Sequence, residues 1–327
     1  MTDIAAAEAA IKTGKFLFLA GDERVLSRLP RGNWIGGTIP YFMGQDGGVT
    51  ARDRVFVHEA PAGTQGAKIA VYDEAHLSSI PRDAPENGFS VIIIPATSRV
   101  HVSYARNAPG YDGIFLKPII GWIAGVHLDD LGQVHPKVFD GSTGAAHPDR
   151  AVVMHVTLPA HQQASIGMVN LFKQGQGDEL AFTEEGFLVR DCLVNGTQVN
   201  FAKYLRSLGV DTRLPLVADY SGTRVNVSFQ SVNDKEGTVA LYAPVFTGVT
   251  YRVAEPVKDY VREFTALLPT GLATLSFSCN CILNFLYSEL EGKKTGAITG
   301  PITFGEIAYQ LLNQTMTYLE IHDVEPT

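Results

Sequence analysis

The segment Cys279-Asn280-Cys281 holds the side chains best suited to chemistry in this chain. It follows a strand-like stretch, 272–277, and precedes a helix-like stretch, 282–290, so we expect it to form the turn between them. Open α/β sheets bind ligands beyond the carboxyl ends of their strands. Asn280 is a suitable N-cap for the following helix, whose free amides favour an anion and lower the pKa of a nearby thiol.

Three readings of these cysteines follow from their chemistry. A thiolate of Cys279 or Cys281 could serve as a nucleophile, although no histidine nearby in the sequence supplies the base. Two cysteines complete only half of a tetrahedral zinc set, so no structural zinc is expected. The third reading is structural, because free cysteine is among the residue types most often buried.

The nine histidines are scattered along the chain. None forms a His-x-x-x-His or Cys-x-x-Cys-His motif, so neither a zinc protease nor a covalent haem site is indicated. His101 follows a continuous apolar run, 89–96, that reads as a buried strand, where it could form the wall of a polar pocket or lie partly exposed on a helix.

Two glycine-containing turns recur in the same context near the two ends of the chain. Gly36-Gly37-Thr38 lies within 16–59 and Thr299-Gly300-Pro301 within 272–320, each between stretches of strand character. We expect the two segments to be equivalent strand–helix–strand units that line one ligand pocket together with Cys279, Asn280 and Cys281, because glycine lets backbone amides approach a ligand. On that view Gly300→Leu removes binding and leaves the protein folded. Chance recurrence of glycine turns in an α/β protein is the alternative.

The elements that position these residues predict an α/β (α+β) protein of two related halves, with mixed sheets and an internal strand–helix–strand duplication. Helical character follows the buried run from 97 to 106, and the alternation over 223–253 predicts an antiparallel meander. Apolar residues at helical spacing predict a helix over 255–268.

Composition narrows the class of protein. The formal net charge is −8 and no cluster of Lys and Arg occurs, so nucleic acid is not an expected partner. The apolar runs are far shorter than the roughly 20 residues that span a bilayer, so no membrane segment is expected. Without a secretory signal pattern, and with three cysteines, we expect a cytoplasmic protein without disulfides.

Several passages together resemble the FIST family of sensory domains, in the family's order. The passages 117–125, 138–141 and 151–156 resemble the middle of the N-terminal domain, and 177–196 resembles the family's strand–turn–strand passage. The passage 199–209 resembles the helix that opens the C-terminal domain, and 300–306 and 313–315 resemble the family's ending. The resemblance implies a FIST N-terminal-like domain at 1–194 and a FIST C-terminal-like domain at 195–327. The chain departs from the family at Trp122 and in lacking an arginine between 277 and 290.

The resemblance implies a non-catalytic sensory protein that binds a small molecule. It is expected to act through a separate signalling partner, because the chain carries no recognisable output segment, and the helix amides after Cys281 favour an anionic ligand. No cofactor is expected, although some FIST proteins bind haem. The expected ligand-binding residues are Gly36, Gly37, Thr38, Cys279, Asn280, Cys281, Thr299, Gly300 and Pro301. The alternatives are a cysteine-dependent enzyme and a haem-based gas sensor.

Overall fold

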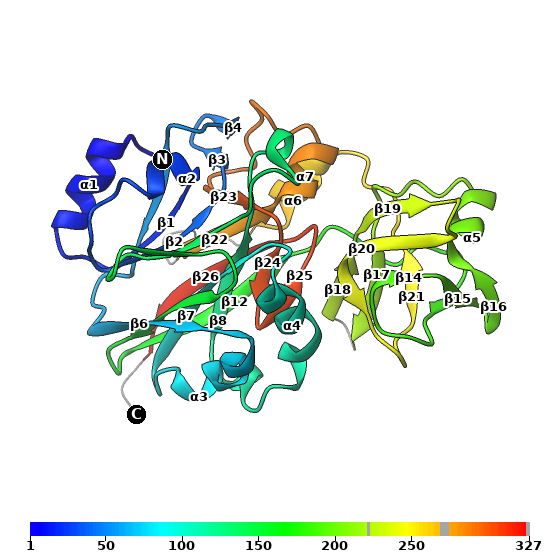
Figure 1. The fold of residues 1–327 in the computed structure, drawn as a ribbon, viewed down its shortest axis with the longest axis horizontal. Coiled ribbons are helices and arrows are strands. Elements are labelled where there is room, and N and C mark those ends of the chain that lie inside the picture. Colours follow the sequence, from blue (N-terminus) through cyan, green and yellow to red (C-terminus); the bar gives the residue numbers. More distant parts are fainter. Residues whose placement is uncertain (221–222, 269–274, 325–327) are drawn as a thin grey trace. The chain divides into compact units, whose positions relative to one another are not determined.

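The computed structural model describes residues 1–220, 223–268 and 275–324 (Figure 1). The chain forms two compact units. Unit 1 comprises Met1–Val169, Leu267–Leu311 and Met316–Thr327, and unit 2 comprises Asn170–Ala266 and Leu312–Thr315. The predicted boundary at 194/195 falls inside unit 2, and the division into two FIST-like domains stays a prediction.

Unit 1 contains most of the strands and short helices. Its strands are β1 (Leu17–Gly21), β2 (Trp34–Thr38), β3 (Tyr41–Gly44), β4 (Gly47–Thr50), β5 (Val55–Glu59), β6 (Gly66–Tyr72), β7 (Gly88–Pro95), β8 (Ile119–Ala124), β9 (Val138–Asp140), β10 (Ala145–His147), β11 (Ala151–Thr157), β12 (Gln162–Val169), β22 (Leu275–Cys281), β23 (Gly300–Thr303), β24 (Glu306–Ala308), β25 (Gln310–Leu312) and β26 (Met316–Asp323). Its α-helices are α1 (Ile4–Lys12), α2 (Glu23–Leu26), α3 (Ile80–Asp83), α4 (Arg99–Asn107) and α7 (Ile282–Tyr287). Its 3-10 helices are η1 (Glu74–Ser79), η2 (Ala108–Gly110), η3 (Ile114–Leu116) and η4 (Leu128–Asp130).

The strands of unit 1 repeat one pattern three times. In each repeat a first strand is followed by a short helix and a parallel second strand, then by a pair of short strands, and then by a last strand antiparallel to the first. Repeat 1 (17–59) runs from β1 to β5, repeat 2 (88–157) from β7 to β11, and repeat 3 (275–323) from β22 to β26.

The repeats exchange their short strand pairs in a cycle. The pair β9 and β10 of repeat 2 extends the sheet of repeat 1, in the order β10-β9-β2-β1-β5. The pair of repeat 3 extends the sheet of repeat 2, β25-β24-β8-β7-β11-β6, and the pair of repeat 1 extends that of repeat 3, β4-β3-β23-β22-β26-β12. Each sheet therefore needs two repeats, and the cycle closes after three.

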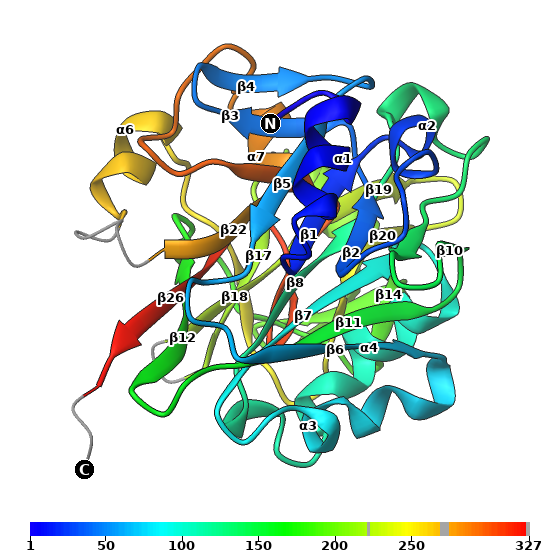
Figure 2. The same ribbon diagram turned by 90° about the vertical axis from the view of Figure 1, so that its left-hand side faces the viewer.

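A lead segment completes each repeat. β6 precedes repeat 2 and pairs antiparallel with its last strand, β12 does the same for repeat 3, and Thr2 bridges to Val55 of β5 in repeat 1. The helix α1 begins after Asp3, whose carboxylate accepts a hydrogen bond from Ala6 N at 2.8 Å. It packs on β1 and β5 through Ala7 and Ile11 (Figure 2).

The connection between the second strand and the strand pair differs among the repeats. In repeat 1 it is residues 39–40 and in repeat 3 it is residues 304–305, so that two residues suffice to cross between sheets. In repeat 2 the same connection spans 125–137 and contains η4. This long connection is the clearest departure from the threefold pattern.

Unit 2 is mainly antiparallel sheet. It contains β13 (Leu180–Ala181), β14 (Gly186–Val189), β15 (Asp191–Val194), β16 (Thr197–Asn200), α5 (Phe201–Ser207), β17 (Leu216–Tyr220), β18 (Thr223–Val227), β19 (Phe229–Asn233), β20 (Thr238–Val245), β21 (Tyr251–Val253) and α6 (Tyr260–Ala266). Its sheets are β16-β15-β13-β21-β17-β18 and β14-β20-β19. The strands expected over 223–253 are present, but the expected meander is wrong, because β18 and β21 belong to one sheet and only β19 and β20 pair as successive antiparallel strands. The helix expected over 255–268 begins only at Tyr260, because Asp259 accepts a hydrogen bond from Arg262 N at 3.1 Å and caps it there.

The α/β (α+β) class with mixed sheets is confirmed, and so is the duplication, since 16–59 and the described part of 272–320 share strand order and direction. Residues 272–274 lie outside the described residues. Repeat 2 is a third copy of the same pattern. The internal duplication expected between two segments is therefore a threefold repeat within unit 1. Thr38 is the last paired residue of β2 and Thr303 the last paired residue of β23, so these two positions are equivalent. Counting back from them, Gly300 is equivalent to Ile35 and not to Gly37.

The expected turn at Cys279-Asn280-Cys281 is wrong, because these residues end β22. Their backbone is paired on both sides, with Met316 and Thr317 of β26 and with Ile302 and Thr303 of β23. Asn280 is not the N-cap of the next helix; Cys281 holds that position. The helix α7 has only 6 residues.

Candidate functional site

A pocket of about 300 Å³ lies at the carboxyl ends of the parallel strands β1 and β2. We call it the strand-end pocket. α2 and the residues after β2 form one side, and the long connection 125–137 forms the other. Its lining residues are Asp22, Glu23, Arg24, Ser27, Thr38, Ile39, Pro40, Gly125, Val126, His127, Asp130, Val134 and His135.

The start of the long connection is held against the end of β2 by backbone and side-chain bonds. Gly125 N donates to Thr38 O at 2.7 Å, and Lys137 N donates to Thr38 Oγ1 at 3.0 Å. Gly125 is glycine for a packing reason, since a Cβ there would lie 2.3 Å from the ring of Phe304. Both ends of the connection are therefore fixed to β2, and the residues between them enclose the pocket.

The carboxylates around the strand-end pocket already have partners. Asp22 accepts a hydrogen bond from Arg24 N at 3.0 Å and caps α2. Glu23 forms an ion pair with Lys137. Asp130 forms one with Arg52, at an N–O distance of 2.8 Å. Two of the three negative charges are thus balanced by cations outside the lining.

In the described part of the chain, the hydrogen-bond donors that line the pocket have fewer partners within the protein than its carboxylates do. His127 stacks on Tyr41, with ring centroids 5.6 Å apart, and its Nδ1 accepts a hydrogen bond from Asp129 N at 3.3 Å. With Nδ1 as the acceptor of this hydrogen bond, the neutral ring carries its proton on Nε2, and the exposed Asp129 carboxylate lies 3.5 Å from Nδ1. The Tyr41 hydroxyl accepts from Leu128 N at 3.0 Å, and burial raises the pKa of Tyr41. Among the described residues, the Arg24 guanidinium has no ion-pair partner.

The predicted site residues do not share one pocket, and one of them, Thr299, also lines a separate hollow of about 550 Å³ beside residues 44–49. Cys279, Asn280, Thr299, Gly300 and Pro301 line one cavity of about 10 Å³, which holds at most a single water molecule. Thr38 lines the strand-end pocket instead. Gly36 and Gly37 are buried within β2, and Cys281 is buried at the start of α7.

The glycines are explained by close packing. A Cβ on Gly37 would lie 2.6 Å from Ile93 Cγ2, and one on Gly300 would lie 2.3 Å from the carbonyl oxygen of Ser278. Because a backbone carbonyl cannot move aside cheaply, the geometry opposes the expectation that Gly300→Leu leaves the protein folded. Gly36 is less restricted, with its nearest neighbour, Trp34 Cζ3, at 3.1 Å.

The thiols lack the environment of a nucleophile. Cys279 is 1% exposed, and its Sγ lies 3.4 Å from Gly121 O and 3.2 Å from Thr317 Oγ1. Burial, and then the nearby charge of Glu306, raise the pKa of the Cys279 thiol well above its usual range. Burial raises the pKa of Cys192 to about 12. Thiolate chemistry needs a lowered pKa and access, and these two residues have neither.

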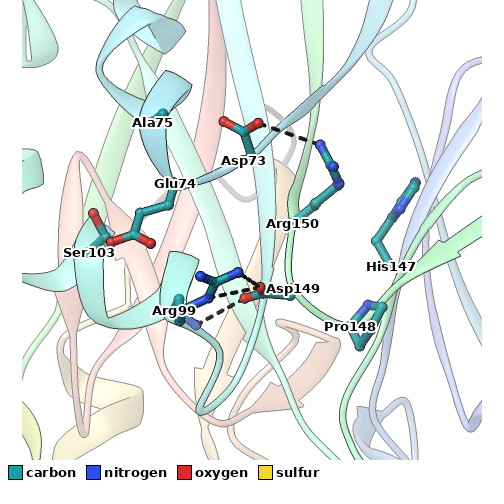
Figure 3. A pocket seen from close by; sticks show the side chains of 9 residues that line it. All are labelled: Asp73, Glu74, Ala75, Arg99, Ser103, His147, Pro148, Asp149 and Arg150. Atoms are coloured by element: carbon teal, nitrogen blue, oxygen red, sulfur yellow. Dashed lines mark hydrogen bonds and ion pairs between the residues drawn. The ribbon is translucent and has the colours of Figure 1, made fainter.

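A larger hollow, of about 720 Å³, lies at the start of α4 and is strongly charged (Figure 3). Arg99 donates to Asp149 from both Nε and Nη2, at 3.2 and 2.9 Å, and Arg150 lies 3.7 Å from Asp73. The hydrogen bonds from Arg99 hold the pKa of Asp149 below its ordinary value. Each guanidinium faces a carboxylate of the chain itself, so the charges of this hollow are satisfied without a ligand.

Sequence reasoning missed a buried polar chain in repeat 2. His155 is 3% exposed, with Ser90 Oγ 2.8 Å from its Nδ1 and Tyr72 Oη 2.8 Å from its Nε2. Tyr72 also donates to Asp83 Oδ2 at 3.1 Å. The order resembles a catalytic relay, but Ser90 is 0% exposed, so no substrate reaches its hydroxyl. These hydrogen bonds connect side chains of β6, β7 and β11, so the buried polar groups of Tyr72, Ser90 and His155 all have partners.

His101 lies partly exposed on α4, as one of the two readings expected, and desolvation of its imidazole lowers the pKa to about 4. Its Nδ1 accepts a hydrogen bond from Thr97 N at 3.2 Å, and it does not line the strand-end pocket. Within the described part of the chain, no group of three His, Cys, Asp or Glu side chains could hold a metal ion.

Of the lining residues, only Thr38 was predicted from the sequence as a binding residue, and neither Arg24 nor His127 was singled out. The signal available was the spacing: a long polar stretch, 125–137, stands in repeat 2 where the other repeats turn within two residues. Recognising it requires the third repeat.

Over residues 2–322 the chain matches the sequence profile of a family of unknown function, DUF6976, and it belongs to that family. No curated protein and no solved structure matches it. None of the helices in the described residues is long and apolar enough to cross a membrane.

Proposed function

We propose that this member of the DUF6976 family is a non-catalytic protein that binds a small molecule in the strand-end pocket and passes the signal to a separate protein. The observation that carries the proposal is the long connection of repeat 2. The other two repeats make the same crossing with two residues, so the fold does not need 125–137. What those residues add is half the lining of a pocket at the carboxyl ends of parallel strands, where α/β sheets bind ligands.

The lining suits binding better than catalysis. Its acidic side chains are engaged as a helix cap and in ion pairs, so none is free to act as a general base. Cys279 and Cys192 lie outside the pocket, and burial raises the pKa of both thiols. A cysteine-dependent enzyme therefore has no support from this geometry. The sensory role and the separate signalling partner rest on the resemblance to FIST domains, and residence in the cytoplasm is part of the same proposal.

The test compares two tryptophan substitutions in one loop. Val134 lines the pocket and is 40% exposed, whereas Leu131, 54% exposed, does not line it. Val134→Trp fills the pocket, and Leu131→Trp adds the same ring to the same loop beside it. Both side chains are exposed, so both variants should fold.

The measurement is a thermal-shift screen of small carboxylates, amides, amines and nucleosides. A ligand of the native protein raises the melting temperature by mass action. We expect the shift to be kept in Leu131→Trp and lost in Val134→Trp. A shift that survives in Val134→Trp places the ligand elsewhere and contradicts the proposal, as does a screen in which no compound stabilises the native chain.

A further inference from the structure

We infer that the ligand of the strand-end pocket is a small monoanion, a single carboxylate on a compact, partly apolar body. This inference deepens the proposed function and rests on it. Its basis is the way the polar groups of the pocket are already used.

The charges around the pocket leave one cation without a partner. Glu23 and Asp130 are paired with Lys137 and Arg52, and the carboxylate of Asp22 accepts from the first turn of α2. No ion-pair partner of Arg24 exists among the described residues, and its side chain lines the pocket. A guanidinium binds a carboxylate with two parallel hydrogen bonds, which is the strongest recognition this pocket offers.

Two neutral donors lie in the same lining. The Thr38 hydroxyl accepts a hydrogen bond from Lys137 N at 3.0 Å, so its own proton is left to donate. His127 uses Nδ1 as an acceptor, and its Nε2–H is a donor. Thr38 is 3% exposed and the His127 side chain 19% exposed, so both donors are largely shielded from bulk water. Donors facing a shielded space favour a ligand rich in acceptors.

The charges around the pocket disfavour a ligand with more than one negative charge. The three carboxylates of the lining and the three cations Arg24, Lys137 and Arg52 sum to zero. One negative charge on the ligand can be bound directly by Arg24, because the carboxylate of Asp22 accepts from a backbone amide, whereas a second negative charge has no further cation in the lining. A phosphate dianion is therefore disfavoured. The apolar lining residues, Ile39, Pro40, Val126 and Val134, and a volume near the lower end for ligand pockets suit a compact ring or short chain.

The experiment uses matched pairs of acid and amide on the full chain. Isothermal titration with benzoate and benzamide, and with nicotinate and nicotinamide, compares molecules that differ in charge and hardly in shape. Inorganic phosphate is titrated as the dianion. We expect at least one acid to bind about tenfold or more tightly than its amide, the worth of one charge-assisted hydrogen bond, and phosphate not to compete.

The variants assign that preference to one side chain. Arg24→Gln should lower the affinity for the acid about tenfold to hundredfold and leave the affinity for its amide unchanged. Arg28→Gln is the control and should change neither, because Arg28 is exposed, as Arg24 is, but lies outside the lining.

Equal affinity for acid and amide, an acid whose affinity survives Arg24→Gln, or failure of both acids to bind at millimolar concentration overturns the monoanion. If an amide or phosphate binds the native protein and no longer binds Val134→Trp, the strand-end pocket is the binding site but its ligand is not a monoanion. Binding that Val134→Trp does not change rejects the pocket itself.

Discussion

The connection between the second strand and the strand pair differs between repeats 2 and 3. In repeat 2 it is 125–137 and forms one wall of the strand-end pocket, whereas in repeat 3 it is 304–305 and only joins the two strands. The strands on either side are alike in order and direction. The shorter connection shows what the fold requires, which is two residues. The longer one shows what has been added, namely histidine, aspartate and apolar side chains around a cavity at the strand ends. Function is thus most readily sought where the repeats differ.

The largest effect is expected from making the two connections equal. Replacing 125–137 with Phe-Gly, the sequence of 304–305, should remove the pocket and all binding. Unit 1 should still unfold cooperatively, because the two-residue crossing already works in repeats 1 and 3 and a shorter loop costs less entropy to close. Circular dichroism on heating and the binding titration check the two parts. A chain that no longer folds would show that 125–137 is structural.

The second effect concerns glycines in the second strand of each repeat. Gly121 and Gly300 are equivalent in register, and a Cβ on them would lie 1.7 Å from Ile92 O and 2.3 Å from Ser278 O. In repeat 1 the equivalent position is Ile35, and the neighbouring Gly36 has 3.1 Å to its nearest neighbour. Gly121→Ala and Gly300→Ala should lower the free energy of unfolding by about 3 kcal/mol or more, and Gly36→Ala by about 1 kcal/mol. Denaturant titration measures all three. Equal losses would mean that the repeats do not differ in how closely these strands approach.

A third effect concerns how the stability of the protein falls with pH, which depends on the histidines of repeats 1 and 2 whose imidazoles are desolvated. Burial lowers the pKa of His58 in repeat 1 and of His101 and His155 in repeat 2 to about 4, while the one histidine of repeat 3, His322, is exposed. The ordinary value is 6.5. The unfolded chain therefore binds protons first, and the stability contributed by each neutral imidazole is present above pH 6.5 and is lost as the pH falls towards 4.

At pH 5 the loss is about 2 kcal/mol for each of these histidines, relative to neutral pH. His58 lies between the rings of Phe56 and Phe277, so His58→Phe keeps an aromatic ring there. The drop in unfolding free energy between pH 7 and pH 5 should shrink by about 2 kcal/mol in this variant. The exposed His161→Phe is the control. An unchanged drop in His58→Phe would show that His58 titrates alike in the folded and unfolded chain.

Sequence patterns predicted the fold where hydrophobic periodicity was strong. The run of β7 is buried along its whole length, as expected, and the matched order of elements revealed repeats 1 and 3. Repeat 2 escaped notice because its second strand, Ile119–Ala124, is followed by 125–137 and not by a short turn. The end of β22 was missed because its backbone partners, Thr303 and Thr317, lie far along the chain.

The candidate site was less accessible to sequence reasoning. Thr38 was expected to line a pocket together with Gly300 and Cys279, whereas in the structure it lines the strand-end pocket with other neighbours. Arg24 and His127 come from different repeats and meet only because the strand pair of repeat 2 joins the sheet of repeat 1. The glycines were assigned to ligand contact, whereas Gly37 and Gly300 make room for neighbouring strands. Spacing in the chain reports neither of these three-dimensional facts.

The most direct test of the strand-end pocket is a crystal structure of the native chain grown with the acid that binds best. The account predicts electron density for one carboxylate between Arg24, Thr38 and His127, enclosed by 125–137. Density in the hollow beside Arg99 and Arg150, or against Cys279 and Gly300, would contradict it and move the function to another part of unit 1.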